Sequence, residues 1–313
     1  MKRAFVFPGQ GSQAPGMGLA LAQSFTPARL LFEEVDDALS QRLSRLMFEG
    51  PEGELMLTEN AQPALLANSL AVMRVLEAEA GFDLARHAAY VAGHSLGEYS
   101  ALAAAGAIPV ADAARLVKRR GQAMQKAVPV GEGAMAALLG IDMDGAEAVA
   151  REAAEGEICA VANDNCPGQI VVSGHAGAVE RAVQLAAARG ARRSMMLSVS
   201  APFHSPLMAP AADIVKDALG TTPLQPPLVP LVANVTAAPT ADPAEIKELL
   251  IEQTVRMVRW RETVLLFREH EVEEIVEIGA GRVLSGLIRR IDRDLATASV
   301  AAPADIDDFV KRL

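Results

Sequence analysis

Apolar runs of strand length alternate with longer helical patterns along the N-terminal part of the chain. Residues 3–7 (RAFVF) predict a short buried strand that ends at the glycine-rich turn 8–13. Residues 88–93 (AAYVAG) predict a second strand, which breaks directly into a helix running to about Ala105. Apolar positions three and four residues apart predict further helices at 28–48, at 63–80 with Pro63 at its start, and at 112–128. This alternation is typical of a parallel sheet flanked by helices, an α/β fold.

A different pattern begins after residues 129–133. The next segments read strand, helix, strand, strand, helix, strand, at 134–139, 144–154, 158–162, 169–173, 177–189 and 192–198. This βαββαβ order is ferredoxin-like. We therefore predict a small domain at 130–198, inserted into a large α/β domain made of 1–129 and 199–313. The chain re-enters the large domain at Ser200-Ala201-Pro202 and continues with a strand at 229–234, a helix at 243–251, a strand at 273–278 and a basic C-terminal helix.

The composition narrows the class of protein. Hydrophobic residues make up 51% of the 313 residues, which supplies a large core and excludes disorder as the main character. The net charge of −10 makes nucleic acid and anionic membranes poor partners. Two cysteines, Cys159 and Cys166, with five scattered histidines build neither a disulfide framework nor a zinc site, so we expect no metal and no cofactor. The apolar stretch 4–7 is too short for a signal peptide, and we expect a soluble, cytoplasmic protein with monomer as the default.

Residues 93–97, Gly-His-Ser-Leu-Gly, fit the G-x-S-x-G pattern between a predicted strand and a predicted helix. A turn this sharp needs small flanking residues, because the backbone passes close to its neighbours. It raises the hydroxyl of Ser95 above the sheet and directs the first N–H groups of the helix toward it, where negative charge is stabilised. The pattern predicts a serine nucleophile.

A serine nucleophile needs a base, and His204 is the best candidate. It lies in Ala-Pro-Phe-His-Ser-Pro at 201–206, where two prolines hold the loop rigid. His94 belongs to the turn itself. His87 and His175 lie in polar connections, and His270 has four glutamates around it, which is typical of a solvated helix end.

Arg120 falls on the apolar face of its predicted helix. At ~100° per residue, it joins the stripe of Ala113, Leu116, Val117, Met124 and Val128. A buried guanidinium without an anion is costly. It therefore pairs either with an internal Asp or Glu or with a substrate carboxylate, which its planar fork binds through two hydrogen bonds.

The turn at 8–13 leaves two interpretations open. Gly9, Gly11 and Ala14 satisfy the G-x-G-x-x-A pattern of a dinucleotide site, with Glu33 about 20 residues on. Pro15-Gly16 interrupts the helix that such a site requires, which disfavours this interpretation. The alternative is a turn that offers a backbone N–H to the serine site.

Six motifs together resemble the malonyl-CoA:acyl carrier protein transacylases, over nearly the whole chain and in the same order. They are FPGQGSQ at 7–13, GHSLGEYSAL at 93–102, RRGQAMQ at 119–125, NCPGQIVVSG at 165–174, VSAPFHSPLM at 199–208 and EIGAGRVLSGL at 277–287. The resemblance implies a hydrolase-like α/β core with a ferredoxin-like insertion. It also implies malonyl transfer to the phosphopantetheine thiol of acyl carrier protein by a ping-pong route, in the service of fatty-acid synthesis.

The resemblance also implies roles for individual residues. Ser95 would be the acylated nucleophile and His204 its base. The backbone N–H groups of Gln10 and Leu96 would form the oxyanion hole, and the main-chain carbonyl of Gln253 would orient the histidine.

Three arginines receive binding roles by the same resemblance. Arg120 would bind the free malonyl carboxylate, and Arg192 and Arg193 would contact the acidic carrier protein. The basic residues of segment 111–130 either add to that docking surface or form an ordinary solvated helix face.

Three alternatives stay open. A serine esterase or thioesterase shares G-x-S-x-G and would use His270 as base with Asp242 as acid. An acyltransferase of a polyketide pathway would use the same residues. A non-catalytic docking module for carrier protein is disfavoured by the intact Ser95 and His204.

Overall fold

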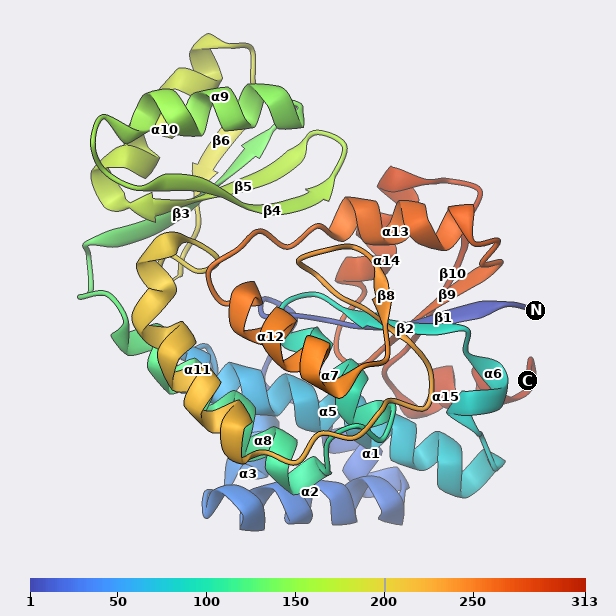
Figure 1. Ribbon diagram of the computed structural model, residues 1–313. Helices are drawn as coiled ribbons and strands as arrows, with labels where there is room; N and C mark the ends of the chain where they lie inside the picture. The colour runs from blue at the N-terminus through green and yellow to red at the C-terminus, as the bar shows by residue number, and fades with distance from the viewer. Residues whose placement is uncertain (200) are drawn as a thin grey trace.

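The computed structural model describes residues 1–199 and 201–313. A six-stranded sheet forms the centre of its larger part, in the order β10 (Ala296–Val300), β9 (Glu274–Ile278), β1 (Arg3–Phe7), β2 (Tyr90–Gly93), β7 (Leu231–Val232) and β8 (Pro239–Thr240) (Figure 1). The first five strands are parallel, and β8 pairs antiparallel with β7. The apolar run of β1 is buried along its whole length, as a central strand of a parallel sheet requires.

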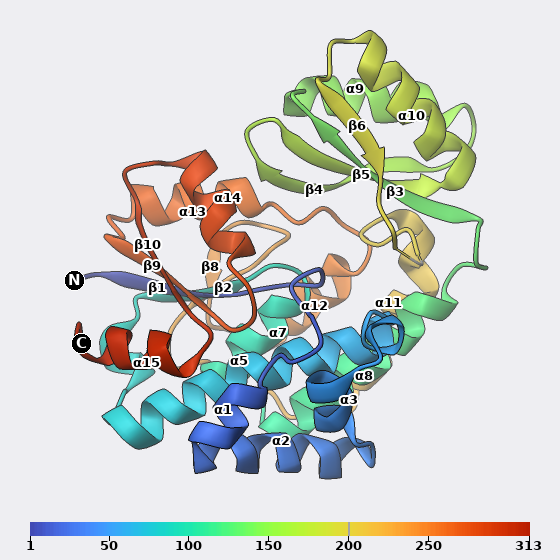
Figure 2. The ribbon, with the colours of Figure 1, turned by 180° about the vertical axis from the view of Figure 1, so that it is seen from behind.

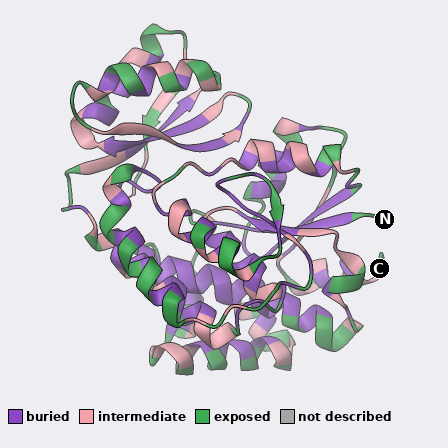
Figure 3. Cartoon of the chain, viewed as in Figure 1, coloured by how far each residue is buried: buried purple, intermediate pink, exposed green. Residues whose placement is uncertain are grey.

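Helices cover both faces of this sheet, and alternate side chains of β1 explain why. Phe5 and Phe7 enter one core, whereas Ala4 and Val6 enter the other. The second core takes in α13 (Trp260–Glu269) and α14 (Val283–Ile291). The first takes in α1 (Leu19–Ser24), α2 (Thr26–Leu39), α3 (Leu43–Glu49), α4 (Glu52–Leu55), α5 (Thr58–Ala80), α6 (Leu84–His87), α7 (Leu96–Ala104), α8 (Val110–Lys126), α11 (Ala209–Thr221), α12 (Pro243–Gln253) and α15 (Pro303–Val310). Figure 3 shows the sheet and inner helix faces buried and the outer helix faces exposed.

A second, four-stranded antiparallel sheet stands above the first, as Figure 2 shows from behind. Its order is β4 (Cys159–Cys166), β5 (Gln169–His175), β3 (Gly133–Leu139) and β6 (Arg193–Met196). Helices α9 (Met143–Ala154) and α10 (Ala176–Ala188) pack on one face through alanine and valine side chains. The predicted α/β class and the βαββαβ insertion are confirmed.

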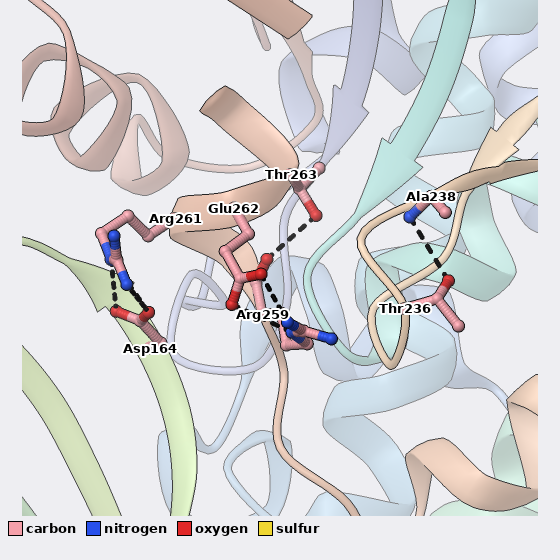
Figure 4. A network of polar contacts seen from close by, with 7 residues as sticks. All are labelled: Asp164, Thr236, Ala238, Arg259, Arg261, Glu262 and Thr263. Atoms are coloured by element: carbon pink, nitrogen blue, oxygen red, sulfur yellow. Dashed lines mark hydrogen bonds and ion pairs between the residues drawn. The ribbon is translucent and has the colours of Figure 1, made fainter. Parts of the chain in front are cut away.

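Strand β4 of the antiparallel sheet is bonded to the segment that leads into α13 of the larger part. The N–H of Val258 donates to the carbonyl of Ala162, and the N–H of Asp164 donates to the carbonyl of Val258, at 2.9 and 3.0 Å. The buried carboxylate of Asp164 also accepts from Arg261 at the start of α13, at 2.9 and 3.1 Å (Figure 4). These bonds hold the antiparallel sheet against the larger part of the molecule.

All strands of the antiparallel sheet come from 133–196, and all strands of the parallel sheet come from outside that range. We keep the division into 130–198 and 1–129 with 199–313 as our proposal for the domains. The predicted point of return includes Ser200, which lies outside the described residues. In the described ranges, no helix is long and apolar enough to cross a membrane.

Two predicted helix boundaries are wrong. The helix predicted at 28–48 is two helices, because Ser40 takes a left-handed φ of 49° and ends α2 there. The helix predicted to start at Pro63 starts at Thr58 instead, and Pro63 lies inside α5. Proline removes one backbone donor there, but the first turn of α5 is buried, and its packing outweighs that loss.

Candidate active site

The turn from β2 into α7 brings Ser95 to the carboxyl end of the parallel sheet. Ser95 adopts a left-handed φ of 52°, which is strained for a residue with a side chain. Glycines on both sides are required by space. A Cβ on Gly93 would lie 1.9 Å from the carbonyl carbon of Gly97, and a Cβ on Gly97 would lie 2.0 Å from the carbonyl oxygen of Phe7. The turn is therefore the strained elbow that the G-x-S-x-G pattern predicts.

His204 lies beside Ser95. Its Nε2 is 2.8 Å from Ser95 Oγ, and its Nδ1 is 2.7 Å from the main-chain oxygen of Gln253. Because a carbonyl oxygen only accepts, the proton is on Nδ1, and the free lone pair of Nε2 faces the serine hydroxyl. Burial first, and then the charge of Arg120, lower the pKa of His204 to about 3. The imidazole is therefore neutral at pH 7 and able to take a proton.

Arg120 is buried and reaches the same serine. Its side chain is 1% exposed. Nη1 donates to Gln62 Oε1 at 2.8 Å, and Nη2 donates to Gln253 Oε1 at 2.8 Å and to Ser95 Oγ at 3.1 Å. These hydrogen-bond partners, taken from the described ranges, are all neutral. Arg120 thus carries its positive charge next to the Ser95 hydroxyl, with no carboxylate of the described residues directly bound to it.

Two backbone N–H groups complete the surroundings of Ser95. Gln10 lies in the turn after β1, and Leu96 is the first residue of α7. Neither N–H has a hydrogen-bond partner within 1–199 or 201–313, as expected for Leu96 at a helix start. The N–H of Ser95 itself donates to Asn234 Oδ1 at 2.7 Å.

A cavity of about 440 Å³ unites these groups. Gln10, Ser95, Leu96, Arg120 and His204 line it, and its apolar wall comes from Met56, Leu57, Met124, Met135, Leu197, Val199 and Phe203. Met135 of β3 and Asn163 of β4 line it together with the turns that follow β1 and β2, so the cavity lies between the antiparallel sheet and the carboxyl end of the parallel sheet. The Gln253 side chain is buried behind it and also donates to the main-chain oxygen of Ser95 at 3.0 Å.

Other sequence candidates lie elsewhere. His270 bonds the hydroxyl of Tyr90 at 2.7 Å, and Asp242 caps α12, so this pair does not flank Ser95. Arg192 and Arg193 lie at the start of β6, and Arg193 is exposed there. In segment 111–130, Arg115 pairs with Asp112 and Lys118 with Glu59, so part of that basic set is neutralised by the protein itself.

Two buried residues at the site escaped the sequence analysis. Glu98 is 1% exposed in the first turn of α7, and its Oε2 accepts from Gln253 Nε2 at 2.8 Å and from the N–H of Asn234 at 3.1 Å. Asn234 follows β7. A sequence feature could have identified each of them. Glu98 is an acidic residue among apolar neighbours in a helix. Asn234 is a polar residue at the carboxyl end of a parallel strand, where ligand-binding and active sites usually lie.

We expect Glu98→Gln to remove a pH-dependent loss of stability. Burial raises the pKa of Glu98 from 4.5 to about 7. Below pH 4.5 the carboxyl is neutral in both states; as the pH rises to 7, only the unfolded chain ionises, and the free energy of unfolding falls by about 3 kcal/mol. Urea unfolding at pH 5 and pH 8 should show this fall in the wild type and a smaller fall in Glu98→Gln. Equal falls would contradict the expectation.

The geometry is that of a class of α/β enzymes: a serine on a strained elbow, with a histidine and a buried arginine within hydrogen-bond distance of its hydroxyl. A family model described as the acyl transferase domain matches residues 4–306. The malonyl CoA-acyl carrier protein transacylase of Bacillus subtilis is 47% identical over 100% of this chain and 97% of its own length. The chain belongs to this transacylase family, and the resemblance predicted from its motifs is confirmed.

Solved structures agree with this assignment. The acyl-carrier-protein-S-malonyltransferase of Bartonella henselae superposes with a TM-score of 0.98 at 52% identity, covering 100% of this chain and 99% of that one. A malonyl-transacylase in complex with a type II PKS acyl-carrier protein superposes with a TM-score of 0.96 at 42% identity, covering 100% of both chains.

Proposed function

We propose that this protein transfers a malonyl group from malonyl-CoA to the phosphopantetheine thiol of acyl carrier protein, through a malonyl ester of Ser95. One observation carries the choice of acyl group. The buried guanidinium of Arg120 lies 3.1 Å from Ser95 Oγ and is bound only to neutral partners in the part of the chain that the structure describes. A dicarboxylic acyl group places its free carboxylate on this cation and its thioester on the serine.

In the first half-reaction, Ser95 Oγ attacks the thioester carbonyl while His204 Nε2 takes the hydroxyl proton. The carbonyl of Gln253 stabilises the imidazolium through Nδ1–H. The N–H groups of Gln10 and Leu96 hold the tetrahedral oxyanion, where one such donor is worth ~3 kcal/mol in comparable sites. The C–S bond then breaks, and His204 returns the proton to the sulfur of coenzyme A.

The second half-reaction runs in reverse with a different thiol. The phosphopantetheine thiol of the carrier gives its proton to His204 and attacks the ester carbonyl. The C–O bond to Ser95 breaks, and the hydroxyl regains the proton. Arg120 holds the malonyl carboxylate throughout, so that the ester carbonyl stays on the oxyanion donors.

The test of the proposed function is the fate of the acyl-enzyme. Mixing with malonyl-CoA should add the mass of one malonyl group, and a pantetheine thiol should remove it faster than water does. Rapid release of free malonate without thiol would favour the esterase alternative. No adduct at all would favour the docking module.

We propose fatty-acid synthesis as the pathway served, with the polyketide role as the second candidate because one solved relative binds a type II PKS carrier. We further propose a cytoplasmic location, since both cysteines are free thiols, as is usual in a reducing compartment. A monomer suffices as the working unit, because every proposed site residue comes from one chain.

Arg192 and Arg193 are our candidates for carrier docking. Arg193 begins β6 and Arg192 precedes it, and the chain leads from there to Leu197–Val199 on the cavity wall. Reversing both charges to Glu should raise the KM for carrier protein about tenfold at low ionic strength, because opposite charges steer association. Acylation by malonyl-CoA should not change. The control is Arg74→Glu with Arg86→Glu, two surface arginines of α5 and α6; equal effects of both pairs would refute local docking.

A further inference from the structure

Asn234 reaches the nucleophile through the pairing of two short strands. Strands β2 and β7 are parallel, with Val91 opposite Leu231. Both strands end within two residues of this pair. The chain then continues from β2 to Ser95 and from β7 to Asn234. The carboxyl ends of parallel strands meet at one edge, so this side chain lies directly beside the elbow. Asn234 is fully buried, at 0% exposure.

The side-chain amide of Asn234 spans the elbow. Its Oδ1 accepts from the N–H of Ser95 at 2.7 Å, and its Nδ2 donates to the main-chain oxygen of Gly93 at 2.6 Å. The two partners fix which end is oxygen and which is nitrogen, since one only donates and the other only accepts. One amide thus holds the peptide groups on both sides of His94, where the backbone enters its left-handed conformation.

The amide is itself held in place by the surrounding backbone. The N–H of Asn234 donates to Glu98 Oε2 at 3.1 Å, and its carbonyl accepts from the N–H of Arg259 at 3.0 Å. The loop that follows closes on itself through the N–H of Ala238 and the hydroxyl of Thr236, at 3.3 Å, beside the start of α13 (Figure 4). Asn234 is therefore anchored on both sides before it contacts the elbow.

The contact has a consequence for the chemistry. Because Asn234 occupies the N–H of Ser95, the first N–H of the turn without a partner among the described residues is that of Leu96. The same contact sets the rotation of the elbow, and with it the 2.8 Å approach of Ser95 Oγ to His204 Nε2. A displacement of 1 Å at such a centre is enough to slow a reaction about a hundredfold.

We propose that Asn234 is a positioning residue for acyl transfer, whose side-chain amide holds the elbow in the conformation that presents Ser95 to His204. The proposal rests on the proposed function, since it takes Ser95 as the nucleophile. It requires an amide specifically: an acceptor at one end for Ser95 and a donor at the other for Gly93. A carboxylate satisfies the first need and opposes the second.

Asn234→Asp tests this requirement, because the Asp side chain has nearly the same size and shape as that of Asn. When ionised, the carboxylate repels the carbonyl of Gly93; when protonated, it donates to that carbonyl as the amide does. We expect the single-turnover rate of acyl-enzyme formation to fall about a hundredfold at pH 8 and to recover by about tenfold per pH unit as the carboxyl takes up its proton. The KM for malonyl-CoA should stay within about twofold, because Asn234 does not line the cavity.

Other groups near Asn234 titrate or carry charge, and the design separates them. They are Glu98 from α7, bonded to Asn234 directly; Arg120 from α8, reached through Gln253; His94, whose flanking peptide groups Asn234 holds; and His204 from the loop before α11, bonded to Ser95. The wild type and Asn234→Asp are therefore each also measured with the additional substitution Glu98→Gln. A pH response of the acylation rate that appears only in the proteins with Asn234→Asp then comes from position 234. Asn68→Asp, a buried amide of α5 outside the cavity, is the matched control and should show no rescue at low pH.

Asn234→Ala supplies the second variant, with thermal unfolding to establish that it is folded. It should acylate slowly at every pH, with no recovery. A folded Asn234→Ala that acylates at the wild-type rate, or an Asn234→Asp whose loss is the same at pH 6 and pH 8, overturns the positioning role. Failure of the wild type itself to form an acyl-enzyme overturns the proposed function instead, so the two outcomes are distinct.

Discussion

Ser95→Ala is expected to abolish the acyl-enzyme and to lower malonyl transfer by about 10⁴-fold or more. The hydroxyl is the only group that forms the ester in the proposed mechanism, and it lies 2.8 Å from the base that activates it. Intact-protein mass spectrometry after mixing with malonyl-CoA measures the adduct directly. Binding of malonyl-CoA should persist, because Arg120 keeps its bonds to Gln62 and Gln253.

A matched control is available within the same cavity. Ser198 also lines it, but it lies outside the elbow and has no proposed part in the reaction. Ser198→Ala should form the malonyl adduct as the wild type does. His204→Ala should acylate slowly although the serine is intact. An adduct on Ser95→Ala at the wild-type rate would place the nucleophile elsewhere and refute the covalent mechanism.

Arg120→Ala is expected to reduce malonyl transfer at least tenfold and to narrow the preference for malonyl-CoA over acetyl-CoA. A hydrogen-bonded ion pair contributes about 1.5–3 kcal/mol, which is a factor of about 10 to 150. Acetyl-CoA has no free carboxylate on its acyl group, so its transfer loses only the bond from Arg120 to Ser95 Oγ. The measurement is kcat/KM for both thioesters in the wild type and the variant.

Two further variants sharpen this result. Arg119→Ala removes the neighbouring arginine, which is exposed on the opposite face of α8, and should leave the preference unchanged. Arg120→Lys keeps the charge without the planar fork and should recover the preference only in part. If Arg120→Ala discriminates between the thioesters as well as the wild type does, the carboxylate is bound elsewhere.

Arg120→Ala is also expected to change the pH dependence of acetyl transfer. The charge of Arg120 is the second cause, after burial, of the low pKa of His204. Removing that charge lets His204 protonate at a higher pH, so the acid limb of acetyl transfer should move upward in Arg120→Ala. An unmoved acid limb would mean that burial alone keeps the imidazole neutral.

Local physics was sufficient for the features that depend on neighbouring residues. Two glycines around Ser95 predict an elbow because a tight turn excludes Cβ atoms, and the structure shows those contacts with Gly97 and Phe7. The helical period places Arg120 on the buried face of α8, where the structure has it. The order of strands and helices at 134–198 predicts the inserted sheet, since hydrophobic period and turn residues are local signals.

Local physics failed where packing outweighed it. Proline at position 63 reads as a helix start, yet the buried turn before it is helical. The strand predicted at 229–234 shortens to Leu231–Val232, because the chain turns at once to set Asn234 against the elbow. The hydrophobic periodicity of a sequence does not predict contacts between distant residues that form only when the backbone has folded.

By itself, the sequence determined the elbow, the buried guanidinium, the inserted fold and, through its motifs, the family. The motifs also implied the carbonyl of Gln253 on His204, but only the tertiary structure decided two other neighbours of Ser95: the carboxyl of Glu98 and the amide of Asn234. The physical reason is that an elbow and a helix face are set by residues a few positions apart. These hydrogen bonds join groups as many as 155 positions apart, which meet only when parallel strands bring their ends to one edge of the sheet.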